Sequence, residues 1–411
     1  MKKLIALLLV LLMALAAVAC TATPAPEAPT SAPPVETSAD TGDDKEEETP
    51  AADNKYDQSD KIIIGCVTSL TGERAQNGVY TKEALDMLQE ELAAEGGVLG
   101  KEVEFVFEDD QSTDQGGANA YQKLMSRGDV NATVVSLYSS IALALEPYVK
   151  QYEIPTFTGG SSVKFAEIGN PFMWQIRYND LLAGSTMATA AIDTLGMTKP
   201  AIIHESDSFG QGLADASKAK LIELGIAEGD IKMLTYNKGE KNFSPFTAQI
   251  KEAGCDGIIA VSQQIEASLI MMQVQAAGLN IPCIGSTSYC SEIAINNAED
   301  AAEGWYSVSD WSPTVETENG KAFVERYRAK YNKDPDLPSS TMYDSALVLI
   351  EAMKAGNSVE PKTINENLAK IDGFEGVAAT YAPNEDRICA KTQFLTKNVD
   401  GKPAIQDIIS R

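Results

Sequence analysis

The segment Lys61-Ile62-Ile63-Ile64-Gly65-Cys66-Val67 decides the fold class of this chain. It is a continuous apolar run of strand length, which is the pattern of a parallel strand covered on both faces. A Gly-containing turn at 69–72 follows, and then a helical stretch that carries Leu85, Leu88 and Leu92 on one face. This alternation of buried strand and amphipathic helix predicts an α/β domain built on a parallel sheet.

The alternation continues along the chain in two series. The first series predicts strands at 61–67, 103–107, 133–135 and 154–157. The second predicts strands at 200–204, 231–234, 257–261 and 282–285, separated by helices at 212–224, 246–253 and 266–277. Helices around 323–331 and 345–353 and short strand-like stretches complete the chain. Two successive series of similar length predict two doubly wound parallel sheets.

The first twenty residues have the layout of an export signal. Lys2 and Lys3 precede an apolar run from Leu4 to Ala19, which is short of the roughly 20 residues that a membrane span needs. The small residues before Cys20 resemble a bacterial lipobox, in which the cysteine becomes the lipidated first residue. We therefore expect a signal peptide at 1–19 and export to the outer face of the cell membrane, with a lipid anchor on Cys20. An ordinary cleavable signal with an incidental cysteine, or a short anchor helix, remains the alternative.

Residues 20–60 have the composition of a linker. They are rich in Pro, Ala, Thr and Ser, and they include the acidic run 43–48. Almost no bulky apolar side chain is present to offset the entropy of ordering, so we expect a disordered, extended spacer. The roughly 350 residues that follow are long enough for two domains.

Charge and cysteine content exclude several classes of partner. The formal net charge of −26 argues against nucleic acid and against a surface that binds anionic lipid. Beyond Cys20, cysteines occur at 66, 255, 283, 290 and 389, a spacing that matches no zinc signature. Their number is odd, so at least one is unpaired within the chain. Pairing of Cys283 with Cys290 stays open, but buried free thiols are expected.

The sequence contains no arrangement of residues that is typical of a catalytic site. His204 is the only histidine, it follows a predicted strand, and no Gly-x-Ser-x-Gly elbow occurs. A dinucleotide loop at Gly210-Gln211-Gly212 lacks its third glycine, because Asp215 stands there. The segment 96–101 is followed by Glu102, where a phosphate loop needs Ser or Thr. We expect no enzyme activity, no metal and no cofactor.

Binding features instead follow the predicted strands, at the sheet edge where open α/β folds hold ligands. Ser139 and Ser140 open a helix after the third strand, where unpaired N–H groups and the helix dipole favour a carboxylate. Plain N-capping by Ser139 is the equal alternative. Gly159-Gly160-Ser161-Ser162 follows the fourth strand, where glycines let the backbone approach a ligand, although a bare turn explains it as well.

Residues 61–411 resemble the branched-chain amino-acid-binding proteins of ABC importers, which are type I periplasmic binding proteins. Each matching stretch is short, and their order along the chain carries the resemblance: Ile64-Gly65, Thr71-Gly72, 96–101, Glu108-Asp109-Asp110, Ser139-Ser140, Ile154-Pro155, 209–212, 276–279, 302–304 and Tyr343-Asp344. The resemblance implies two lobes joined by three crossovers near Asp180, Ser309 and Ala382. The lobes would comprise 61–180 with 310–382, and 181–309 with 383–411.

The resemblance also implies a ligand site. By position, Ser139 with Ser161 and Ser162 would bind the carboxylate of an amino acid, and Asp180 its ammonium. Phe209 takes the place of a ring that flanks the ligand. Two other aromatic positions of the family are replaced, by Asn77 and Gln263. The full expected set is Asn77, Ser139, Ser140, Ser161, Ser162, Asp180, Phe209, Gln263 and Thr287.

The main departure from the family is Thr287, which stands where a second ammonium-binding carboxylate is expected. Arg177 also lies where the family has a neutral residue, and we interpret it as a surface or structural ion pair rather than a ligand contact. The polar site leaves polar amino acids, urea-like amides and small organic acids open. We expect a monomeric receptor that delivers its solute to ABC permease subunits. A sensory receptor on the same fold is the alternative.

Overall fold

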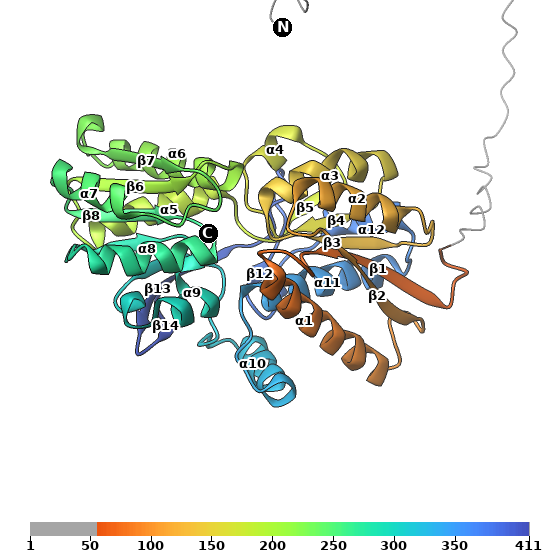
Figure 1. Cartoon of the computed structure of the whole chain (residues 1–411). Coiled ribbons are helices and arrows are strands. Elements are labelled where there is room, and N and C mark those ends of the chain that lie inside the picture. Colours follow the sequence, from red (N-terminus) through yellow and green to blue (C-terminus); the bar gives the residue numbers. More distant parts are fainter. Residues whose placement is uncertain (1–55, 411) are drawn as a thin grey trace, which may run out of the picture. The chain divides into compact units, whose positions relative to one another are not determined.

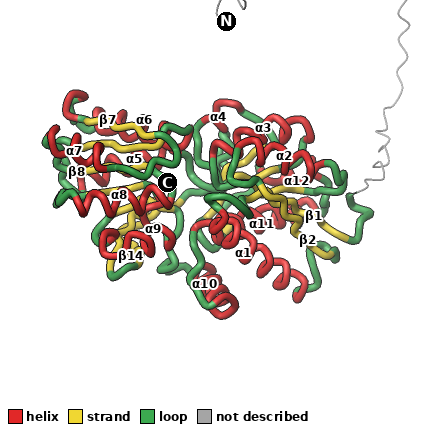
Figure 2. The backbone as a smooth tube through the Cα atoms, in the orientation of Figure 1, coloured by secondary structure: helices red, strands yellow, loops and turns green. Residues whose placement is uncertain are grey.

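The structure, a computed structural model, describes residues 56–410. The predicted signal peptide, Cys20 and most of the predicted linker lie outside the described residues. None of the helices within 56–410 is long and apolar enough to cross a membrane. Helices bracket two separate groups of strands in this part of the chain (Figures 1 and 2).

The first sheet has five parallel strands in the order β2-β1-β3-β4-β5. Its strands are β1 (Lys61–Thr68), β2 (Glu102–Asp109), β3 (Ala132–Val135), β4 (Thr156–Thr158) and β5 (Met173–Gln175). The helices of this first lobe are α1 (Ala75–Ala94), α2 (Asp114–Met125), α3 (Ser139–Tyr152), α4 (Lys164–Ile168), α10 (Glu318–Tyr331), α11 (Leu337–Gly356) and α12 (Pro361–Leu368). A short hairpin, β11 (Phe374–Glu375) with β12 (Thr380–Tyr381), belongs to it as well.

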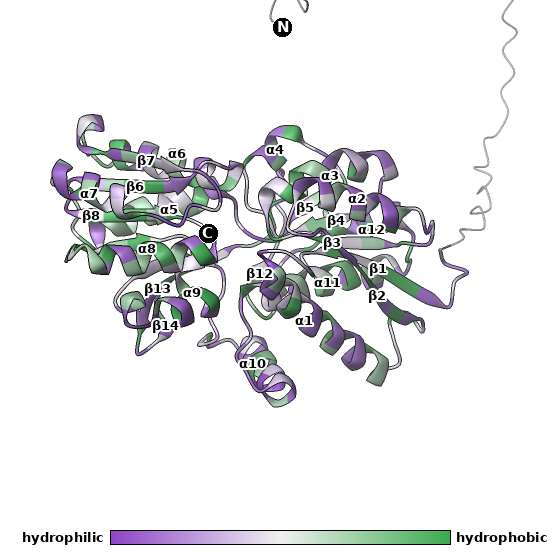
Figure 3. Ribbon diagram, viewed as in Figure 1, coloured by the Kyte–Doolittle hydropathy of each residue, from purple (hydrophilic) through white to green (hydrophobic). Residues whose placement is uncertain are grey.

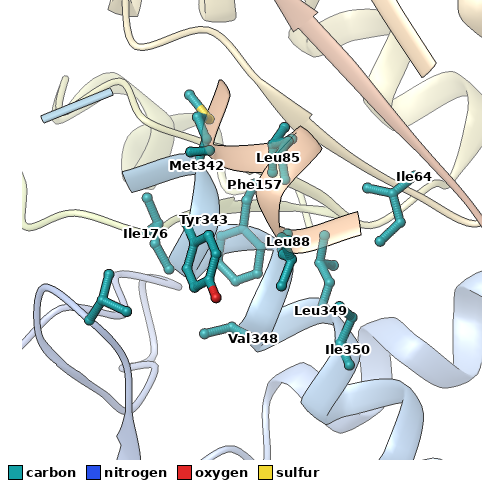
Figure 4. Close-up of a cluster of buried hydrophobic side chains, with 14 of the residues drawn as sticks. Ile64, Leu85, Leu88, Phe157, Ile176, Met342, Tyr343, Val348, Leu349 and Ile350 are labelled. Carbon is teal, nitrogen blue, oxygen red and sulfur yellow. The ribbon is translucent and has the colours of Figure 1, made fainter. Parts of the chain in front are cut away.

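Strand β1 is buried on both faces, as its apolar run predicts. Ile62 and Ile64 point into a core that α1 and α11 cover, whereas Ile63 and Val67 point into one that α2 and α3 cover. Figure 4 shows part of the first core, where side chains of α1 and α11 gather around Phe157. At Gly65 an added Cβ would lie 2.1 Å from Leu124 of α2, so only glycine lets that helix pack so close.

The second sheet has seven strands in the order β14-β13-β10-β9-β8-β6-β7. Its strands are β6 (Pro200–Glu205), β7 (Lys232–Tyr236), β8 (Gly257–Val261), β9 (Cys283–Gly285), β10 (Tyr306–Ser309), β13 (Thr392–Val399) and β14 (Lys402–Ser410). The helices are α5 (Asp180–Asp193), α6 (Ser208–Glu223), α7 (Ser244–Ala253), α8 (Gln264–Ala276) and α9 (Glu292–Ala298), with 3₁₀ turns η1 (Glu228–Asp230), η2 (Thr287–Cys290) and η3 (Glu299–Ala302). Figure 3 shows hydrophobic residues along β6, as a covered strand requires.

The sequence predicts two parallel sheets, but the second sheet is not wholly parallel. β13 runs antiparallel to β10, and β14 runs antiparallel to β13. The two strands are joined at Asp400 and Gly401, both with positive φ. Asp-Gly favours this tight hairpin turn. The short stretches expected at the chain end are therefore one long hairpin at the sheet edge.

The chain passes between the two sheets three times. The first passage is 176–179, next to Asp180, and the second follows β10, which ends at Ser309. The third comes later than Ala382, where it was expected. Ile388 bridges to Gln175 of β5, and the Cys389 N–H donates to the Gln175 carbonyl oxygen. Residues 384–390 therefore stay with the first lobe, and the expected boundary at 382 is wrong by about eight residues.

Candidate functional site

Three small adjoining cavities lie where loops of the two lobes meet, and we call them together the cleft. The inner cavity, about 10 Å³, is lined by Ser161, Arg177, Asp180, Phe209 and Thr287 among others. The middle cavity, about 20 Å³, shares Arg177, Phe209 and Thr287 with it and adds Asn77, Ser139 and Gln263. The outer cavity, about 230 Å³, shares Asn77, Tyr138 and Gln263 with the middle one and adds Arg74 and Glu266.

Seven of the nine expected residues thus come together at the cleft, and the other two do not line it. Ser140 is half-buried on α3. Ser162 is buried, but its hydroxyl accepts the Lys164 N–H and its carbonyl oxygen accepts the Gln175 side-chain amide. Ser162 therefore stabilises the loop that follows β4 and does not line the cleft.

Ser139 holds the glycine-containing loop against the start of α3. Its hydroxyl oxygen accepts the N–H groups of Ser161 at 3.1 Å and Ser162 at 3.2 Å. The N-cap residue is Tyr138, and its side chain makes no capping hydrogen bond. Plain N-capping by Ser139 is therefore wrong. Because the Ser139 oxygen accepts twice, its own hydrogen remains available to a ligand oxygen.

Asp180 is a buried carboxylate that faces the inner cavity. It opens α5 and is fully buried, and neither of its oxygens has a hydrogen-bond partner among the described residues. Burial raises its pKa from 3.8 to about 7, although the Ser161 hydroxyl, which lies near the carboxylate without meeting hydrogen-bond geometry, and the charge of Arg177 act in the opposite direction. An added Cβ at Gly212 would lie 3.0 Å from Asp180 Oδ2, so glycine there makes room for the carboxylate.

Arg177 forms a buried ion pair with Asp310. Its Nε and Nη2 donate to the two carboxylate oxygens, the second at 3.0 Å, and its Nη1 donates to the Gly159 carbonyl oxygen at 3.1 Å. The Asp310 charge raises the pKa of Arg177 against the opposing effect of burial. The predicted structural ion pair of Arg177 is therefore confirmed, whereas a position on the surface is wrong because the side chain is buried. The pair joins the first passage between the lobes to the second.

The remaining expected residues come from both lobes. Asn77 of α1 donates its side-chain amide to the Tyr138 hydroxyl, while its Oδ1 has no partner within residues 56–410. Gln263 is the N-cap of α8 without a side-chain cap, and the Thr287 hydroxyl lies 2.9 Å from that of Ser309. Phe209 is buried at the start of α6 and separates the inner from the middle cavity.

Sequence reasoning missed the charged residues Arg74 and Glu266, which line the outer cavity, and Glu205, which is buried and lines none of the three cavities. Arg74 is 7 % exposed and lies 3.8 Å above the centre of the Tyr138 ring, and its Nη1 has no partner in the described chain. Glu266 of α8 lines the same cavity. Glu205 is fully buried at the end of β6, and both of its oxygens are unpaired within 56–410. The position of Glu205 directly after a predicted strand was a signal that could have identified it.

The charged groups near the outer cavity shift the pKa values of two carboxylates. Burial, together with the charges of Asp207 and Glu266, raises the pKa of Glu205 from 4.5 to about 8, against the opposing charges of Arg74 and Lys238. Burial also raises the pKa of Glu266. Both carboxylates therefore lie in an environment that disfavours their charged form.

Two contacts bring the lobes together at the rim of the cleft. The Tyr80 hydroxyl of α1 donates to a carboxylate oxygen of Glu292 on α9. Lys238, which follows β7, pairs with Glu73 at 3.0 Å. In this conformation the cleft is therefore closed over its inner and middle cavities.

Other reactive groups have structural surroundings. The ring nitrogens of His204 lie 3.0 Å from the Glu205 carbonyl oxygen and 2.9 Å from the Thr235 hydroxyl. The five cysteines within 56–410 are free and buried, as expected, so Cys283 and Cys290 are not paired. A larger hollow of about 700 Å³ opens beside β11, β12 and β14, but it contains none of the expected site residues.

Comparison with known proteins agrees with this geometry. A family model described as periplasmic binding protein matches residues 61–398. A Leu/Ile/Val-binding protein homologue of Brucella abortus is 25 % identical over 327 residues, 79 % of this chain and 86 % of that protein. A leucine-binding protein of Thermotoga maritima, LivK, matches with a TM-score of 0.79 at 24 % identity, covering 85 % of this chain and 99 % of that one.

A solute-binding protein of an ABC transporter from R. palustris, solved with benzoate, matches with a TM-score of 0.77 at 19 % identity, over 85 % of this chain and 96 % of that one. These likenesses show the type I periplasmic binding protein fold. Because the family model spans most of the chain, this protein belongs to the periplasmic binding protein family, whose members bind ligands and are not enzymes.

Proposed function

We propose that this protein is the exported solute receptor of an ABC importer and that its ligand is an α-amino acid. The observation that carries the proposal is the buried, unpaired carboxylate of Asp180 in the inner cavity. A buried carboxylate without donors is costly unless a ligand supplies them, and an ammonium group supplies three.

The carboxylate of the ligand would lie at the other side of Phe209, near Ser139. The first-turn N–H groups of α3 have no side-chain cap, and the Ser139 hydroxyl can donate to a ligand oxygen. Ser139 and Asp180 belong to different lobes, so an amino acid bound to both would hold the lobes together. The curated relative from Brucella abortus, described as a Leu/Ile/Val-binding protein homologue, supports this class of ligand.

We further propose that Cys20 carries a lipid and that 20–60 is the tether. A receptor held near its membrane partner has a high effective concentration there. The ABC permease subunits are the partner that this function requires.

Isothermal titration of the full-length chain with the twenty standard amino acids tests the receptor function. We expect at least one to bind, and Asp180→Asn to weaken it about 10- to 100-fold, because a charge-assisted hydrogen bond contributes about 1.5–3 kcal/mol. Asp193→Asn, at the exposed far end of the same helix, is the matched control. A folded protein that binds none of the twenty would contradict the proposal.

A further inference from the structure

Two residues in the wall of the outer cavity each carry a buried polar atom that has no partner within 56–410. Arg74 Nη1 is a hydrogen-bond donor, and Asn77 Oδ1 is an acceptor. Arg74 is 7 % exposed and Asn77 is 3 % exposed, so bulk water does not readily replace the missing partners. Leaving a buried polar group unpaired is destabilising. The wall therefore fits a ligand group that supplies one acceptor and one donor.

A single side chain, that of Tyr138, positions both residues. The Arg74 guanidinium lies 3.8 Å from the centre of the Tyr138 ring, and the Asn77 side-chain amide donates to the Tyr138 hydroxyl. Asn77 and Tyr138 line both the middle and the outer cavity, and Ser139 lines the middle one. The unpaired donor and the unpaired acceptor therefore lie near each other at the junction of these two cavities. A short side chain that extends outward from Ser139 reaches this junction.

The charges around the outer cavity balance, which favours a neutral group on the ligand. The acidic and basic residues are equal in number: Glu73, Glu240 and Glu266, and Arg74, Lys238 and Lys241. Lys238 belongs to this set because it pairs with Glu73 at 3.0 Å. Glu205 lies behind the wall, and its pKa of about 8 keeps it mostly protonated at pH 7. A charged side chain would therefore enter the closed cleft without a counter-charge, which is costly.

Resting on the receptor function proposed above, we infer that the ligand is an α-amino acid whose side chain ends in a carboxamide, asparagine or glutamine. The carboxamide oxygen accepts a hydrogen bond from Arg74 Nη1, and the carboxamide N–H donates to Asn77 Oδ1. Other side chains satisfy at most one of the two atoms. An aliphatic group pairs with neither, a carboxylate has no donor for Asn77, and an ammonium or guanidinium has no acceptor for Arg74.

The test compares amino acids of similar shape and different hydrogen-bonding capacity on the full-length chain by isothermal titration. L-Asparagine is compared with L-aspartate and L-leucine, and L-glutamine with L-glutamate and L-norleucine; L-lysine is the cationic member of the panel. We expect at least one of the two amides to bind at least about tenfold more tightly than its acidic and apolar counterparts and than lysine. This is the factor that a lost hydrogen bond to a charged group produces. The comparison uses the unchanged protein and does not depend on any variant folding.

Variants then locate the carboxamide. Arg74→Met removes the donor, and the preference for the amide over its apolar counterpart should shrink about tenfold or more. Asn77→Leu removes the acceptor and keeps the shape of the side chain, and the same preference should shrink about fivefold or more. Arg127→Met and Asn119→Leu make the same changes at exposed positions outside the cleft and should keep the full preference.

The outcomes separate this inference from the function on which it rests. If an apolar, acidic or cationic member of the panel binds as tightly as both amides, the carboxamide assignment is overturned and the receptor function stands. The same holds if Arg74→Met and Asn77→Leu both keep the full preference. If no amino acid binds the folded chain, the receptor function itself fails.

Discussion

The raised pKa of the Asp180 carboxylate predicts how the free energy of unfolding depends on pH. Its pKa rises from 3.8 to about 7 on folding, so the folded state holds a proton that the unfolded state has released between these pH values. For an acid whose pKa is raised by folding, the free energy of unfolding falls as pH rises from about 4 to 7, by about 1.4 kcal/mol per unit. Above about pH 7 the loss is complete.

Asp180→Asn removes this titration and keeps the shape of the side chain. Without ligand, the variant should gain stability relative to the natural chain as pH rises, by about 3 kcal/mol between pH 5 and pH 8. Urea unfolding at both pH values, followed by circular dichroism, measures the difference. Asp193→Asn, which is exposed, should show no such pH-dependent difference.

Two results would refute the reasoning. A constant difference between variant and natural chain at pH 5 and pH 8 would mean that Asp180 does not titrate in this range. A relative loss of stability in the variant at pH 8 would mean that the charged carboxylate is paired in the unliganded protein. Either result removes the physical basis for an ammonium site at Asp180.

Three further predictions follow from other contacts. Arg177→Met should lower the free energy of unfolding by about 3–5 kcal/mol in urea titration, because it leaves Asp310 buried and unpaired, and adding Asp310→Leu should restore part of it; equal stability of single and double variants would contradict this. Gly65→Ala should cost about 1–3 kcal/mol, because the new Cβ meets Leu124 at 2.1 Å; unchanged thermal unfolding would contradict the close packing. Cys20→Ala should abolish incorporation of labelled fatty acid and release the protein from membranes, and continued labelling would exclude Cys20 as the anchor.

Much of the fold could be predicted from local patterns. The apolar run of β1 and the strand-helix alternation after it are short-range signals, and the structure places these elements within a few residues of the prediction. The β13-β14 hairpin was missed, although Asp400-Gly401 is a local signal for it. Helix α5 was also missed, because its Ala-rich sequence has no distinct polar face.

The site was predictable only where family positions carried the information. Ser139, Asp180 and Phe209 lie at the cleft as expected. The Arg177–Asp310 pair joins residues 133 positions apart, and no local pattern marks such a pair. The charge of Arg74 acts on Glu205, although the two residues belong to different lobes and lie far apart in the sequence. Only the three-dimensional arrangement reveals this interaction.

The backbone around Asp180 bears on the order in which a ligand is captured. The Asp180 N–H donates to the Ser161 carbonyl oxygen at 2.8 Å, and Arg177 holds the Gly159 carbonyl oxygen of the same loop. The proposed ammonium contact at Asp180 and the proposed carboxylate contact at Ser139 would therefore lie beside the first passage between the lobes, where domain closure displaces atoms least. We expect the main-chain end of an amino acid to dock first on the open receptor. Discrimination between side chains then belongs to the closing step, and selectivity should be read in the rate at which the closed complex reopens.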